Sequence, residues 1–126
     1  MGDNRPMTDE PIAKLRRLCM GLADATEEFP FNDPQVSVFK VAGKVFAITN
    51  LASRPLRVSV KCDPELGLQL RAAHDGIEPG YHLNKRHWIT VDVERDVSRQ
   101  LVRGLVEDSY DLVRPRRSSK RTTRPA

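Results

Sequence analysis

Apolar residues recur at helical spacing in three stretches of the chain. The first follows a potential cap at Thr8, and its apolar face consists of Ile12, Leu15, Cys19 and Leu22. The second follows Asp63-Pro64-Glu65, a typical helix start, and its apolar face consists of Leu66, Leu70 and Ala73. The third follows Ser98, and its apolar stripe consists of Leu101, Val102, Leu105, Val106, Ser109, Leu112 and Val113. We therefore expect three amphipathic helices.

Between these stretches the period changes to two, as in half-buried strands. Ser37, Phe39 and Val41 alternate with Val36, Val38 and Lys40, and the alternation returns at Phe46 and Ile48 after a turn at Ala42-Gly43. A third run alternates four inward residues with three outward ones, namely Leu56, Val58, Val60 and Cys62 with Arg57, Ser59 and Lys61. A fourth run, residues 87–93, places Ile89, Val91 and Val93 on one side.

The predicted order is helix, three strands, helix, strand, helix. The acidic, proline-containing segment from Glu27 to Pro34 is expected to be loop, and Pro79-Gly80 a turn. Strands in a run flanked by helices favour an α+β fold, a two-layer sandwich in which an antiparallel sheet carries the helices on one face.

The length of 126 residues accommodates one hydrophobic core. We expect a single domain over residues 9–113, preceded by a disordered N-terminus, residues 1–8. No apolar run approaches the roughly 18 residues of a membrane span, and the N-terminus does not resemble a secretory signal. A cytoplasmic location is therefore expected.

Histidine and cysteine are too widely spaced to predict a metal site. Cys19 and Cys62 lie in apolar-patterned segments, and we interpret both as small buried hydrophobic residues. His74, His82, His87 and Cys62 show no recognisable ligand spacing. We expect no metal and no cofactor.

The net charge of +4 is unevenly distributed. Residues 114–126 contain six basic residues and no acid, whereas residues 1–113 contain 15 basic and 17 acidic residues. The tail has almost nothing apolar to bury, so it is expected to be disordered. Within residues 1–113 only the middle third, residues 40–86, is basic, with a net charge of +4. This segregation suggests one binding face for a polyanion.

Four strings resemble the MmcQ/YjbR-like family: FKVAGK (39–44), VSVKCDPE (58–65), YHLNKRHW (81–88) and EDSYDLV (107–113). Their order and spacing match the family pattern over most of residues 9–113. The resemblance implies a fold similar to that of the bacterial frataxin homologue, in agreement with the pattern above. It also implies a "double wing" arrangement and DNA binding, a function that was itself inferred largely from fold.

The segment from Tyr81 to Trp88 is unusually rich in polar and amphipathic side chains. In a functional interpretation Lys85 and Arg86 bind phosphate, Tyr81 and Trp88 stack, and His82 and Asn84 contact base or sugar edges. In a structural interpretation Asn84 and His87 hold a tight turn and Trp88 packs on the sheet. The sequence leaves both open for Asn84, His87 and Trp88.

Basic residues on the predicted strands complete the candidate interface, namely Lys40, Lys44, Arg57 and Lys61. Such residues also serve simply to keep a sheet soluble. A catalytic site would use His82 or His87 as a general base, but neither has a recognisable nucleophile or carboxylate companion, so we expect no enzyme activity. The two hypotheses are DNA binding through the basic residues and a non-catalytic adaptor that binds a protein or a small ligand.

Overall fold

The computed structural model describes residues 9–80, 83–95 and 97–115, and in this part the chain forms three helices and six strands. The helices are α1 (Asp9–Met20), α2 (Pro64–Ala73) and α3 (Arg99–Val113). The strands are β1 (Thr26–Glu28), β2 (Val36–Val41), β3 (Lys44–Asn50), β4 (Arg57–Lys61), β5 (Ile77–Pro79) and β6 (Trp88–Asp92). None of the described helices is long and apolar enough to span a bilayer.

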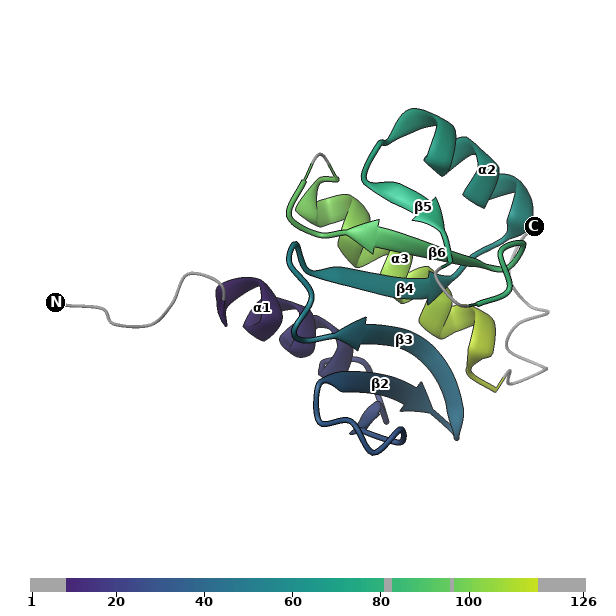
Figure 1. The fold of residues 1–126 in the computed structure, drawn as a ribbon. Coiled ribbons are helices and arrows are strands. Elements are labelled where there is room, and N and C mark those ends of the chain that lie inside the picture. The colour runs from purple at the N-terminus through teal and green to yellow at the C-terminus, as the bar shows by residue number, and fades with distance from the viewer. Residues whose placement is uncertain (1–8, 81–82, 96, 116–126) are drawn as a thin grey trace, which may run out of the picture.

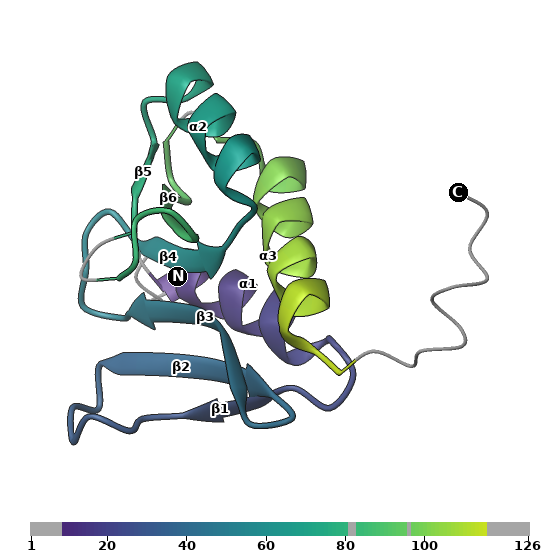
Figure 2. The ribbon, with the colours of Figure 1, turned by 90° about the vertical axis from the view of Figure 1, so that its right-hand side faces the viewer.

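The strands form one antiparallel sheet in the order β1-β2-β3-β4-β6-β5. In the view of Figure 1, α1 and α3 lie behind this sheet, and α2 lies at the top, above β5. In the perpendicular view the strands lie on the left and the helices on the right (Figure 2). The predicted two-layer α+β sandwich with its helices on one face is therefore confirmed, and we call the uncovered side of the sheet the open face.

The core lies between the sheet and the helices because alternate residues of each strand face the helical layer. Phe39, Phe46, Val60 and Ile89 are each at most 1% exposed. Tyr110 of α3 meets Phe46 edge to face, with ring centroids 5.4 Å apart and planes at 90°. Burying each of these large side chains contributes roughly 1.5–3 kcal/mol, so this layer fixes the position of α3 on the sheet.

A two-residue turn joins β2 to β3. Its residues, Ala42 and Gly43, have φ values of 53° and 79°. Two positive φ values are typical of the type I′ turn, whose twist matches that of a hairpin, and glycine reaches this region without strain. The turn places Lys44 at the first position of β3.

A polar cluster attaches α1 to the edge of the sheet. The carboxylate of Glu27 in β1 accepts hydrogen bonds from Arg16 Nε at 3.0 Å and from Ser37 Oγ at 2.6 Å. Ser37 is completely buried, so this contact satisfies a hydroxyl that water cannot reach. The Tyr110 hydroxyl donates to the Ala23 carbonyl at 2.7 Å and ties α3 to the segment after α1.

The structure contains two short strands that the sequence does not predict. Glu27 and Glu28, expected in a loop, lie in β1, and Pro79, expected in a turn, ends β5. Two predicted core positions are also wrong: Ala73 is exposed, and Leu112 is 54% exposed. Gly67 is buried in α2 instead, where a β-carbon would make an ordinary contact with a methyl group of Ile89 at 3.5 Å.

Candidate nucleic-acid interface

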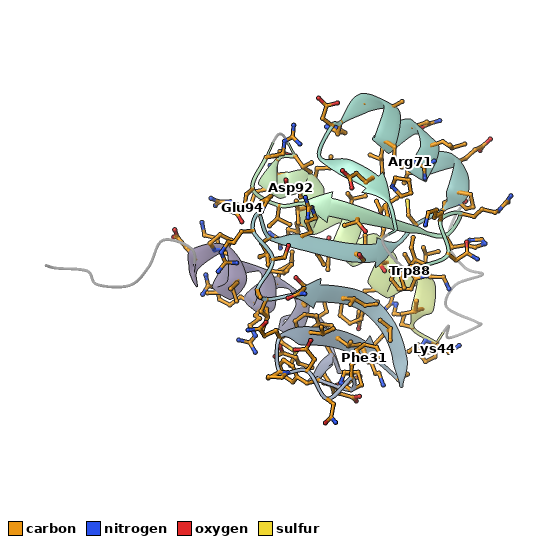
Figure 3. The ribbon with its side chains drawn as sticks, viewed as in Figure 1. Phe31, Lys44, Arg71, Trp88, Asp92 and Glu94 are labelled. Atoms are coloured by element: carbon orange, nitrogen blue, oxygen red, sulfur yellow. The ribbon has the colours of Figure 1, made fainter. Side chains whose placement is uncertain are left out.

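The strand register brings several of the candidate residues to one end of the sheet. Lys61 ends β4 and lies opposite Trp88, which begins β6. Because Ala47 of β3 lies opposite Val60 of β4, the start of β3 at Lys44 reaches the same end. Figure 3 shows Lys44 and Trp88 at this end, on the right of the view.

A tight turn adds two cations to this end. Asn84 holds the turn: its Oδ1 accepts the Arg86 N–H at 2.9 Å, and its carbonyl accepts the N–H groups of His87 at 3.2 Å and Trp88 at 3.0 Å. The geometry supports the structural interpretation of Asn84. Lys85 and Arg86 are exposed on the turn and free to contact a ligand.

Backbone hydrogen bonds hold this turn against the end of β4. The Cys62 N–H donates to the His87 carbonyl at 2.7 Å. One residue earlier, the Lys61 N–H donates to Ser109 Oγ at 2.8 Å, and the same hydroxyl donates to the Phe46 carbonyl at 2.7 Å. A buried serine of α3 thus fixes neighbouring strands beneath the site. We call the following five residues the basic end: Lys44, Lys61, Lys85, Arg86 and Trp88.

Trp88 is held by close packing as well as by the sheet. It alternates with Ile89, which faces the core, so its side chain lies on the open face, where it is half-buried. The Gly80 N–H donates to the Trp88 carbonyl at 2.9 Å, and a β-carbon on Gly80 would lie only 2.7 Å from the β-carbon of Trp88. Only glycine allows this approach, which fixes the backbone and the β-carbon of Trp88 at the start of β6.

Two of the candidate cations, Lys40 and Arg57, are not counted in the basic end. Lys40 of β2 faces the open side near this end, but its Nζ forms an ion pair with Glu28 Oε1 at 2.9 Å. Arg57 begins β4, so it lies at the opposite end of that strand from Lys61, and it faces Asp92 of β6. The remaining candidates, Tyr81 and His82, lie outside the described residues.

The cations of the basic end have no anionic partner in the described part of the chain. None of Lys44, Lys61, Lys85 and Arg86 forms an ion pair there, whereas Lys40, Lys14, Arg16, Arg103 and Arg114 each do. Four cations that have no ion-pair partner among the described residues thus lie at one end of the sheet.

Two ionisable groups that border the basic end, Cys62 and Asp108, have raised pKa values. Burial raises the pKa of the Cys62 thiol, and the carboxylates of Asp63 and Asp108 raise it further, while Arg71 opposes them. Burial also raises the pKa of Asp108, with Asp111 and Glu107 adding to the effect. A protonated Cys62 is not a nucleophile.

Histidine, cysteine and acidic side chains do not gather into a metal-binding group within the described residues. There, no cluster of three or more histidine, cysteine, aspartate or glutamate side chains is placed to hold a metal ion. Within the same ranges, the imidazoles of His74 and His87 form neither a hydrogen bond nor an ion pair.

The predicted disordered segments, residues 1–8 and the tail after Pro115, lie outside the described ranges. Arg114, the first residue of the predicted tail, caps α3 by donating its N–H to the Tyr110 carbonyl at 3.0 Å.

Sequence reasoning missed Ser109 and Gly80 as parts of the site. Ser109 was placed in the apolar stripe of its helix, where a serine among six aliphatic residues is a signal for a buried hydrogen bond. The sequence predicts only a turn at Gly80. Its contact with Trp88 depends on the pairing of β5 with β6, which the local sequence pattern does not predict.

The chain is similar in sequence to several known proteins. Uncharacterized protein YbdF of Escherichia coli O157:H7 is 36% identical over 98 residues, which cover 78% of this chain and 80% of that protein. Uncharacterized protein YjbR of Escherichia coli K12 is 34% identical over 99 residues, covering 79% and 83%.

Solved structures agree with this likeness. The crystal structure of Deinococcus radiodurans protein DR2400, described as domain DUF419, is 44% identical, has a TM-score of 0.77 and covers 81% of this chain and 77% of that one. A Pseudomonas syringae protein is 29% identical with a TM-score of 0.72 over 81% and 97% of the two chains. The YjbR family itself matches residues 20–112, which include the whole basic end, and the chain belongs to the YjbR family.

Proposed function

We propose that the protein binds DNA through contacts between phosphates and the cations of the basic end, with Trp88 available to stack on a base. The observation that carries the proposal is that Lys44, Lys61 and the Lys85-Arg86 pair, from three segments distant in sequence, lie at one end of the sheet. Like charges repel one another, and these four cations have no carboxylate partners in the described ranges. An anion bound between them would therefore reduce their mutual repulsion.

The proposal is one of binding without a catalytic step. Lysine and arginine hold phosphates, and an indole offers a flat face for stacking, which together give affinity with little dependence on base sequence. Lys40 and Arg57 are secondary in this proposal, because Lys40 is paired with Glu28 and Arg57 lies at the other end of β4.

The test compares two double variants of the full chain that lose the same charge. Lys85→Ala/Arg86→Ala removes two cations from the basic end, and Arg17→Ala/Arg99→Ala removes two exposed cations from the helical side. DNA binding, both to a duplex and to a single strand, is followed as a function of salt through the fluorescence of Trp88, the only tryptophan.

Each phosphate contact contributes about 0.9 to the slope of log affinity against log salt for a duplex. The variant of the basic end should therefore lose roughly two units of slope, whereas the Arg17/Arg99 variant should keep the slope of the parent chain. Equal slopes in the two variants would mean that the tail or another surface binds DNA and that the basic end does not. In that case the adaptor hypothesis would replace the proposal.

A further inference from the structure

A second surface lies on the helical side of the molecule, away from the open face. A groove of about 850 Å³ lies between α1 and α3, and the segment between β6 and α3 contributes to its lining. Its apolar lining is provided by both helices and by this segment: Leu15, Leu18, Leu22, Val93, Val97 and Val102. Leu18, Leu22 and Val93 are half-buried, so apolar surface remains accessible within the groove.

Charge around the groove is predominantly positive in the described ranges. Its charged lining comprises five cations and three acids, namely Lys14, Arg17, Arg95, Arg99 and Arg103 with Glu10, Glu94 and Glu107. All three acids already have partners. Glu10 pairs with Lys14 at 3.7 Å, Glu107 pairs with Arg103 at 3.1 Å, and Glu94 Oε2 accepts the Leu56 N–H at 2.6 Å.

The other three cations, Arg17, Arg95 and Arg99, form no ion pair with a described residue and are exposed. Arg99 occupies the first turn of α3, which contains no acid. A cation there opposes the partial positive charge of the helix N-terminus. A negative ligand in the groove would relieve this repulsion, so both the side chains and the helix favour an anionic occupant.

The groove extends along both helices. Its lining follows α1 from Glu10 to Gly21, and a helix of 12 residues is roughly 18 Å long. On α3 the lining residues Arg99, Val102, Arg103 and Glu107 recur at helical spacing. An elongated groove between two helices, with an apolar floor and a basic rim, has the geometry that accepts a third, amphipathic helix.

We infer that this groove binds an acidic amphipathic helix of a partner protein. Apolar side chains of the partner cover Leu18 and Leu22, and its carboxylates pair with Arg17 and Arg99 across the rim. The site lies on a different side of the molecule from the basic end and involves none of its residues. The inference is therefore independent of the proposed DNA binding.

The experiment selects peptides from a displayed random library against the full chain. Peptides enriched by the groove should carry net negative charge with apolar residues at helical spacing. Arg17→Glu/Arg99→Glu should weaken their binding about tenfold or more, because reversed charges repel the partner's carboxylates. Lys85→Glu/Arg86→Glu changes the net charge equally at the basic end and should alter the affinity by no more than about twofold.

A second measurement locates the bound peptide. Amide shifts of the full chain should change along α1 and α3 and remain constant at the basic end. Several results would overturn the inference: no enrichment, enrichment of peptides without net negative charge, equal effects of the two double variants, or shifts confined to the basic end. Because Arg17 and Arg99 are exposed, the groove variant should fold normally, as its circular dichroism will show.

Discussion

Gly80 lies where the chain has no room for a side chain. A β-carbon there would approach the Trp88 β-carbon to 2.7 Å and the Trp88 carbonyl oxygen to 3.1 Å. Gly80→Ala should therefore lower the free energy of unfolding by about 1–3 kcal/mol, since the contact is with backbone and with the base of a side chain that cannot move aside. Urea denaturation followed by far-UV circular dichroism measures this change.

Gly104 provides the matched control. It lies within α3, and a β-carbon there would meet nothing within 4 Å. Gly104→Ala should raise the free energy of unfolding by about 0.5–1 kcal/mol, because alanine restricts the unfolded chain and favours the helix. Destabilisation of similar size in both variants would contradict the role assigned to Gly80.

The two cysteines should be unreactive in the folded protein. Cys19 is completely buried, and burial, with Glu27 adding to it, raises its pKa to about 12. Burial likewise raises the pKa of Cys62. Because only the thiolate attacks a disulfide, an aromatic disulfide reagent at neutral pH should react with either thiol only when the chain unfolds. Rapid modification without denaturant would show that a thiolate is accessible in the native state.

The same raised pKa has a consequence for stability at alkaline pH. The ordinary thiol value is 9.0, so the unfolded chain loses the Cys19 proton at a lower pH than the folded chain does. The stabilisation from the protonated form is complete below pH 9.0 and is lost as the pH rises towards about 12. The free energy of unfolding should decrease over this range, and less steeply in Cys19→Ala, when both are measured by urea denaturation.

At the scale of secondary-structure elements, Ser109 connects α3 to two strands. Ser109→Ala leaves the buried carbonyl of Phe46 and the amide of Lys61 without this partner, and each loss costs about 1–3 kcal/mol. We expect destabilisation of about 2–4 kcal/mol in equilibrium unfolding. Ser98→Ala removes only the exposed N-cap of the same helix and should cost about 1 kcal/mol, so similar losses would contradict the bridging role.

Elements with local signals were predictable from the sequence. Asp63 and Ser98 each accept the N–H three residues later, at Leu66 and Leu101, as their helix-start patterns indicate. β1 and β5 have three residues each and no apolar alternation, and they become strands by pairing with β2 and β6. Such pairing depends on residues far along the chain, which a local pattern does not contain.

The candidate interface was also predictable from the sequence only where the signal is local. Alternation along β4 predicts that Arg57 and Lys61 share a face, but it does not reveal which other cations each will meet. That depends on the register with β3 and β6 and on the contact from Ser109, which joins positions 63 residues apart at Phe46. The residues were therefore predictable as a set, whereas their separation into Lys61 at the basic end and Arg57 at the far end required the fold.

At the scale of the whole molecule, charge is divided between the folded domain and the tail. Residues 116–126 contain five basic residues and no acid, so they would attract any polyanion and could hide the contribution of the domain. Arg114 belongs to the domain instead, since its side chain pairs with Asp111 at 3.1 Å and lies 5.5 Å from the centre of the Tyr110 ring. A chain ending at Pro115 thus keeps every contact between described residues.

Deleting residues 116–126 should lower the affinity for duplex DNA and reduce the magnitude of the salt slope by up to about 4.5 units, the contribution of five phosphate contacts. The melting temperature in scanning calorimetry should stay the same, because no described contact is removed. A decrease of about 4 °C or more would mean that the deleted residues stabilise the domain by roughly 1 kcal/mol. The shortened chain should still bind DNA at low salt, and Lys85→Ala/Arg86→Ala in that chain should remove about half of the remaining slope, since Lys44 and Lys61 are retained. If the shortened chain does not bind DNA at all, the tail alone accounts for the binding, and the four cations around Trp88 have another partner.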